Sequence, residues 1–177
     1  MAIATINPAT GETVREFDSL TDAQVDEALD RAVRGFADYR TTSFEQRAAW
    51  LHATADLLEA EADSVAAMMT EEMGKTLASA KAETLKCAKG FRYYADHGAA
   101  MLADEAADAD AVGASRAYMR YQPLGVVLAV MPWNFPLWQA VRFAAPALMA
   151  GNVGILKHAS NVPQSALYLE DVLRRAG

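Results

Sequence analysis

Residues 126–157 read VVLAVMPWNFPLWQAVRFAAPALMAGNVGILK, and this stretch decides the fold. Its first five residues, Val126–Val130, form a continuous β-favouring apolar run, which is typical of a strand covered on both faces. The next five residues predict a loop, and Pro136 suits the first position of a helix because proline has no N–H to satisfy there. A second apolar run, 153–156, predicts another buried strand of the same kind.

The helix between these strands should run to Met149, with a kink or break at Pro146, since proline cannot donate to the preceding turn. A second helix is expected from Pro163 to Arg175, and Asn161 is the residue best suited to cap it. Strand, helix, strand and helix at this spacing predict a parallel α/β unit. Its ligands should lie beyond the carboxyl ends of the strands, at residues 131–134 and 157–160.

Helices should dominate the chain upstream of this unit. Two pairs have the spacing of a capping box, Thr21 with Gln24 and Ser43 with Gln46, and each opens a run of apolar residues at helical period. A third helix should stop at Gly74. A fourth is expected from about Thr76 to Tyr94, before His97-Gly98.

The remaining segments are extended or irregular. Residues 3–17 alternate weakly around Asn-Pro and Thr-Gly pairs, which predicts short strands joined by a turn. Residues 103–114 are small, acidic and poor in large apolar side chains, so we expect a surface connection. Residues 116–122 alternate as an exposed strand does.

Composition limits what kind of protein this is. The chain has 177 residues, of which 53% are apolar and 22% charged, the balance of a folded protein with a real core. A single cysteine excludes an internal disulfide framework and is compatible with a reducing, cytoplasmic compartment. The N-terminal residues lack the layout of a secretory signal, and the longest apolar stretch, 123–141, is too interrupted to span a bilayer.

Charge is distributed unevenly along the chain. Residues 1–112 carry 10 Lys and Arg against 21 Asp and Glu, a net −11, whereas residues 113–177 carry 6 against 2, a net +4. The acidic first part argues against a nucleic-acid partner, which needs a basic surface. The basic second part suits a small anionic ligand.

Four side chains near the strand ends have chemistry that a ligand site needs, and each also has an ordinary structural alternative. Asn134 can donate to a developing oxyanion or cap the next helix. Trp133 can line a cofactor or fill core. Lys157 can bind a ribose or phosphate or be solvated, and Arg142 can clamp a carboxylate or lie on the surface. Cys87, inside a helix pattern, is expected to be a buried structural thiol.

Taken as a set, several motifs resemble the aldehyde dehydrogenase superfamily, in order along essentially the whole chain. Within that superfamily the resemblance is strongest to the NADP-dependent succinate-semialdehyde dehydrogenases. The motifs are NPATGE at 7–12, EMGK at 72–75, VMPWNFP at 130–136, PAL at 146–148, Gly151-Asn152, LKHAS at 156–160 and Pro163.

The resemblance implies a Rossmann-like sheet and an enzyme that oxidises an aldehyde through a cysteine thiohemiacetal, passes a hydride to NADP or NAD, and hydrolyses the thioester. Asn134 would be the oxyanion donor. The substrate, a small anionic aldehyde, would meet Phe135, Trp138 and Arg142, the last as carboxylate clamp. The cofactor would be bound by Met131, Pro132, Trp133, Asn134, Lys157, His158, Ala159 and Ser160.

Two of these positions differ from the commonest family pattern. Ser160 stands where NAD-preferring members often carry a glutamate, and a serine leaves room for a 2′-phosphate. His158 replaces the proline common after the lysine.

The resemblance also implies that residues 1–177 form an incomplete NAD(P)-binding domain. The nucleophilic cysteine, the general-base glutamate and the catalytic domain would lie outside them, so the chain alone should be inactive. Residues 116–122 would belong to an oligomerisation arm, and the protein would be a homo-oligomer. Two alternatives stay open: a different aldehyde substrate with Arg142 structural, or a non-catalytic binding or assembly fragment.

Overall fold

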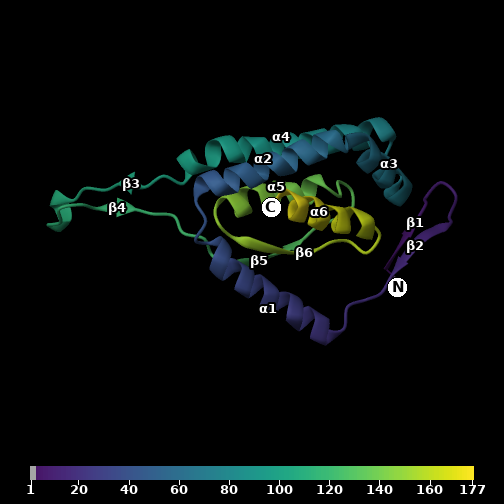
Figure 1. The fold of residues 1–177 in the computed structure, drawn as a ribbon, viewed down its shortest axis with the longest axis horizontal. Coiled ribbons are helices and arrows are strands. Elements are labelled where there is room, and N and C mark those ends of the chain that lie inside the picture. The colour runs from purple at the N-terminus through teal and green to yellow at the C-terminus, as the bar shows by residue number, and fades with distance from the viewer. Residues whose placement is uncertain (1–2) are drawn as a thin grey trace.

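The computed structural model describes residues 3–177, and its helices and strands follow the order expected from the sequence (Figure 1). The helices are α1 (Asp22–Tyr39), α2 (Phe44–Ala60), α3 (Ala62–Met73), α4 (Leu77–Met101), η1 (Asp110–Val112, a 3-10 turn), α5 (Trp138–Met149) and α6 (Pro163–Ala176). The strands are β1 (Ile3–Ile6), β2 (Thr13–Phe17), β3 (Glu105–Ala106), β4 (Tyr118–Met119), β5 (Val126–Val130) and β6 (Val153–Lys157). No helix among these residues is long and apolar enough to cross a membrane.

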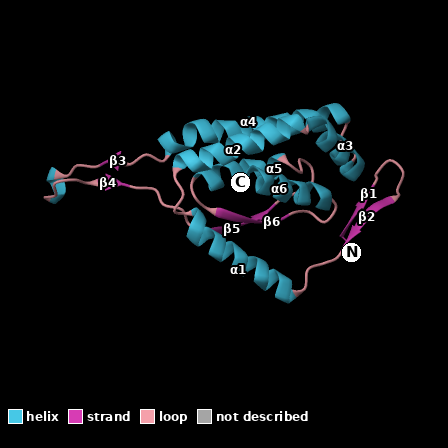
Figure 2. Cartoon of the chain, in the orientation of Figure 1, coloured by secondary structure: helices cyan, strands magenta, loops and turns pink. Residues whose placement is uncertain are grey.

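The parallel α/β unit predicted from residues 126–175 is present. Strands β5 and β6 pair in parallel, with Val126 opposite Val153 and Val130 opposite Lys157. Helices α5 and α6 pack between this pair of strands and the layer made by α2 and α4, while α1 lies on the other side of the strands (Figures 1 and 2). Helix α5 continues through Pro146 without being split.

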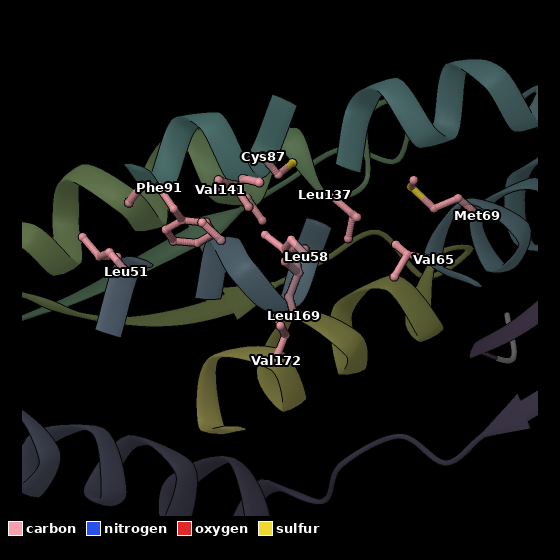
Figure 3. Close-up of a cluster of buried hydrophobic side chains, with 14 of the residues drawn as sticks. Leu51, Leu58, Val65, Met69, Cys87, Phe91, Leu137, Val141, Leu169 and Val172 are labelled. Atoms are coloured by element: carbon pink, nitrogen blue, oxygen red, sulfur yellow. The ribbon is translucent and has the colours of Figure 1, made fainter. Parts of the chain in front are cut away.

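Helices α2, α3, α4, α5 and α6 enclose the main core, which Figure 3 shows in close-up. Helices α4 and α5 approach closely at Gly98, where an added Cβ would lie 2.3 Å from Cγ of Met149. The expected end of this helix before His97-Gly98 is therefore wrong. Gly98 does not end the helix: its missing side chain lets α4 and α5 pack closely, and α4 continues to Met101.

Capping was predicted correctly where the cap is local. Thr21 with Gln24 and Ser43 with Gln46 both form complete capping boxes at the starts of α1 and α2. Helix α3 ends at Gly74, whose φ of +77° is the left-handed conformation that glycine adopts without strain.

The two hairpins lie at opposite ends of the molecule (Figure 1). Strands β1 and β2 form the predicted N-terminal antiparallel pair, with the turn closed by Asn7 Oδ1, which accepts from the Ala9 N–H at 2.9 Å. Strands β3 and β4 form an arm that extends away from the helices. Regular pairing there is limited to Tyr118–Met119, shorter than the strand expected over 116–122.

Strand β5 is less covered than its sequence predicts. Ala129 is buried, but Leu128 and Val130 are each 64% exposed. In the described part of the chain β5 pairs only with β6, and helix α1 covers the opposite face without burying any of its own residues. The expectation of a strand covered on both faces is therefore wrong for these two side chains. It is also wrong for β6, because none of its five residues is buried.

A buried glutamate, rather than Asn161, caps helix α6. The helix begins after Val162, which makes no side-chain cap, and Glu72 of α3 accepts from the backbone N–H groups of Gln164 at 2.6 Å and Ser165 at 3.0 Å. The Glu72 carboxylate also accepts from the hydroxyls of Ser165 at 2.6 Å and Thr5 at 3.0 Å. Its negative charge suits the positive end of the helix dipole, and it joins α3, α6 and β1.

We expect Glu72→Ala to lower the free energy of unfolding by about 2 kcal/mol, because it leaves buried N–H and O–H donors without an acceptor. Urea denaturation measures this change. Glu71→Ala, at an exposed position next to it, is the matched control and should be nearly neutral. Equal stabilities for the two variants would contradict the capping role of Glu72.

Candidate functional site

The loops that follow β5 and β6 lie side by side at one edge of the strand pair. The Met131 N–H donates to the Lys157 carbonyl at 3.1 Å. His158, which is buried, places Nε2 2.7 Å from the Pro136 carbonyl, and its Nδ1 accepts from the Ala159 N–H at 2.8 Å. The two predicted ligand segments thus meet at the expected edge.

Asn134 does not cap the helix that follows it. Helix α5 begins at Trp138, two residues later than expected from Pro136, and its N-cap residue, Leu137, makes no side-chain cap. Asn134 is exposed, and within residues 3–177 its side-chain amide forms no hydrogen bond. The amide N–H groups are therefore free to donate to a ligand, and the helix-cap alternative is removed.

The start of α5 is capped by Glu83 of α4 instead. One carboxylate oxygen of Glu83 accepts from the backbone N–H groups of Leu137 at 3.0 Å and Trp138 at 2.9 Å. The other oxygen is paired with the ammonium of Lys75. Sequence reasoning missed both residues. Lys75 was noticed only within the EMGK motif, and nothing local connects Glu83 to Leu137, which lies 54 positions further along the chain.

The aromatic residues around Asn134 differ in their surroundings. Trp133 and Phe135 are exposed, as residues lining an open ligand site would be. Trp138 is half-buried against α4, with the Lys86 ammonium 4.1 Å from its ring centroid. Arg142, one turn further along α5, is exposed and has no ion-pair partner in the part of the chain that the structure describes. Its guanidinium is free to bind an anion.

The loop after β6 also presents polar side chains outward. Lys157 and Ser160 are exposed, while Ala159 is half-buried and its carbonyl accepts from the Val162 N–H at 3.2 Å to turn the chain into α6. Residues 157–163 read KHASNVP and contain no carboxylate. This edge thus offers an ammonium and a hydroxyl without a negative charge in the same loop, a combination suited to a phosphate.

Asn152 holds the other end of the unit together, a role that sequence reasoning did not assign. Its Oδ1 accepts from the N–H groups of Leu124 at 2.7 Å and Gly125 at 3.1 Å, and its Nδ2 donates to the Ala147 carbonyl at 3.2 Å. The buried amide therefore fixes the start of β5 against the end of α5. The sequence feature that could have indicated this role is the position of Asn152 in a Gly-Asn pair between a helix and a strand.

Cys87 is part of the core, as predicted. It is 0% exposed and belongs to the cluster that contains Phe91 and Val141 (Figure 3). Burial, reinforced by the nearby Glu83 carboxylate, raises the pKa of its thiol well above the ordinary range. Such a thiol is not a nucleophile at neutral pH. Residues 3–177 also contain no group of three or more His, Cys, Asp or Glu side chains that could hold a metal ion.

Known proteins match this chain over its whole length. The model of the aldehyde dehydrogenase family matches residues 1–177. The NADP(+) succinate-semialdehyde dehydrogenase 1 of Mycobacterium bovis is 77% identical over all 177 residues, which cover 39% of that protein. The chain therefore spans about two fifths of the length of such curated relatives.

Solved structures share the fold. The succinic semialdehyde dehydrogenase of Streptococcus pyogenes, in complex with NADP+, superposes with a TM-score of 0.92 at 38% identity, covering 98% of this chain and 38% of that one. The succinate-semialdehyde dehydrogenase of Burkholderia pseudomallei gives 0.92 at 32% identity, covering 100% of this chain and 36% of that one.

Proposed function

The chain belongs to the aldehyde dehydrogenase family, and on that premise we propose that the whole protein oxidises succinate semialdehyde to succinate with NADP as the hydride acceptor. The observation that carries the proposal is the 77% identity to a mycobacterial NADP(+) succinate-semialdehyde dehydrogenase across every residue of the chain. The free guanidinium of Arg142, on the helix that follows the Asn134 loop, supports an acidic substrate.

Residues 1–177 would contribute one part of the active site. Asn134 would donate its side-chain amide to the oxygen of the aldehyde as negative charge develops there, and it is free to do so because Glu83 caps α5. The thiol nucleophile and the base for the hydrolytic water would come from the part of the relatives that this chain does not span. The burial of Cys87 supports that division, and we expect residues 1–177 alone to show no turnover.

The residues at the strand edge fit a phosphorylated dinucleotide. Lys157 would bind the adenosine ribose or its 2′-phosphate, and Ser160 would leave room for that phosphate, in a loop without a carboxylate. Trp133 and the backbone of residues 131–132 would line the cofactor. The hydrogen bonds of Met131 and His158 hold the two loops together and so support this placement. When bound, NADP would supply the acceptor for the hydride of the aldehyde carbon.

We expect Ser160→Glu to raise the dissociation constant for NADP by about 10-fold and that for NAD by less than about 2-fold, because the new carboxylate repels the 2′-phosphate. Fluorescence titration of the full-length enzyme with each cofactor measures both constants. Ser160→Gln adds similar bulk without charge and is the matched control. An equal loss for NADP and NAD would remove Ser160 from the 2′-phosphate site.

The proposed function is tested by following NADPH absorbance with the purified full-length protein. Succinate semialdehyde should give a higher kcat/KM than butanal, which has the same carbon chain without the carboxylate. A preference for butanal would contradict the substrate assignment, and no turnover of any aldehyde would contradict the activity itself.

A further inference from the structure

A largely covered lysine lies against the loop that carries Asn134. Lys75 sits between α3 and α4, and only 9% of its side chain is exposed. Its ammonium is paired with Glu83 and lies 3.4 Å from the Asn134 carbonyl oxygen and 3.7 Å from the centroid of the Phe135 ring. One cation therefore contacts the backbone of Asn134 itself and the aromatic ring of the next residue.

Glu83 fixes the same loop three and four residues after Asn134. Its side chain is 1% exposed, and it accepts from the N–H groups of Leu137 and Trp138. The backbone from Asn134 to Trp138 is thus held at both ends by one ion pair, of which Glu83 is fully buried. Because the Asn134 side chain itself is exposed and unbonded within residues 3–177, its direction depends on how firmly this backbone is held.

We propose that Lys75 is a positioning residue for the oxyanion donor, with Glu83 as its anchor. Lys75 fixes the Asn134 carbonyl and thereby aims the side-chain amide at the place where negative charge develops. An oxyanion donor is effective only within a narrow range of distances, so a small displacement of its backbone lowers the rate. This inference rests on the proposed function, because it takes Asn134 to be the oxyanion donor.

Removing Lys75 alone would not isolate this role. Lys75→Met leaves the buried carboxylate of Glu83 without a counter-ion, which is costly, and the variant is expected to be less stable. Adding Glu83→Gln removes that unpaired charge, and the amide oxygen introduced there can still accept from the two N–H groups of α5. The double variant should therefore regain stability while the contact to the Asn134 carbonyl stays absent.

The first test is kinetic and uses the full-length enzyme. We expect Lys75→Met with Glu83→Gln to unfold near the wild-type temperature but to have a kcat about 10-fold lower, with KM values changed by less than about 2-fold. Lys81→Met is the matched control, since it removes an exposed lysine paired with Asp63 at 2.5 Å. A kcat that recovers together with stability would show that Lys75 is only structural and would overturn the proposal.

A double-mutant cycle with Asn134→Ala shows whether Lys75 acts through Asn134. If it does, the Lys75 and Glu83 substitutions should lower kcat by less than about 2-fold in the Asn134→Ala background, because the group they position is gone. A further loss of about 10-fold in that background would place the effect of Lys75 elsewhere and would overturn the proposal.

Hydrogen exchange provides a readout that does not need activity. The Lys75 and Glu83 substitutions together should speed amide exchange in residues 131–139 but not in residues 158–165, whose helix start is capped by Glu72. Unchanged exchange in residues 131–139 would overturn the proposal. If the wild-type enzyme oxidises no aldehyde, the proposed function fails, and exchange still decides whether Lys75 holds the loop.

Discussion

Replacing Asn134 by alanine in the full-length enzyme is expected to lower kcat by about 10²- to 10³-fold, the loss typical of a missing oxyanion donor. The amide is exposed and unbonded in the described part of the chain, and α5 begins without its help. The substitution should therefore remove charge stabilisation in the transition state and leave the fold unchanged. Steady-state kinetics with succinate semialdehyde, beside thermal unfolding, measure both effects.

The matched control for this substitution is Asn161→Ala. Asn161 is also an exposed asparagine in a loop before a helix, and it does not cap that helix. The kcat of the Asn161→Ala enzyme should remain within about 2-fold of the wild type. A normal kcat for Asn134→Ala would contradict the role of oxyanion donor, and a normal kcat with reduced stability would assign Asn134 a structural role.

The fold could be predicted from the sequence wherever the determinant is local. The apolar runs at β5 and β6, separated by one helix, were enough to predict a parallel unit, and the capping boxes gave the starts of α1 and α2. Local sequence patterns gave wrong helix ends and caps where a residue distant in the sequence makes the deciding contact. Helix α4 runs past Gly98, which packs against Met149 of α5, and Glu72 caps α6 across 92 residues of sequence.

The candidate site shows the same division. The two ligand loops were predicted because each directly follows a strand, and parallel strands place their carboxyl ends together. What holds the loops could not be predicted, because Lys75 and Glu83 belong to the helical layer and Asn152 lies at the opposite end of the strands. In the sequence, a carboxylate that caps a distant helix cannot be distinguished from an ordinary polar residue of an amphipathic helix. Its role becomes visible only when the position of the capped helix is known.

Replacing Arg142 by alanine is expected to lower kcat/KM for succinate semialdehyde by about 10- to 150-fold, the loss of a charged two-hydrogen-bond clamp. Arg142 is exposed on α5 and has no ion-pair partner within residues 3–177. A carbonyl bound at Asn134, near the start of the same helix, would direct the rest of a four-carbon substrate toward it. Butanal, which lacks the carboxylate, should lose less than about 2-fold.

The conservative variant Arg142→Lys separates charge from geometry. A lysine keeps the positive charge but not the planar pair of donors, so its loss with succinate semialdehyde should lie between those of wild type and alanine. Arg174→Ala, an exposed arginine on α6 paired with Asp171, is the matched control and should leave both substrates unaffected. Equal losses for the acid and for butanal would mean that Arg142 only supports α5. The proposed succinate semialdehyde substrate would then lose its support from Arg142, and the substrate would be an aldehyde of unknown type.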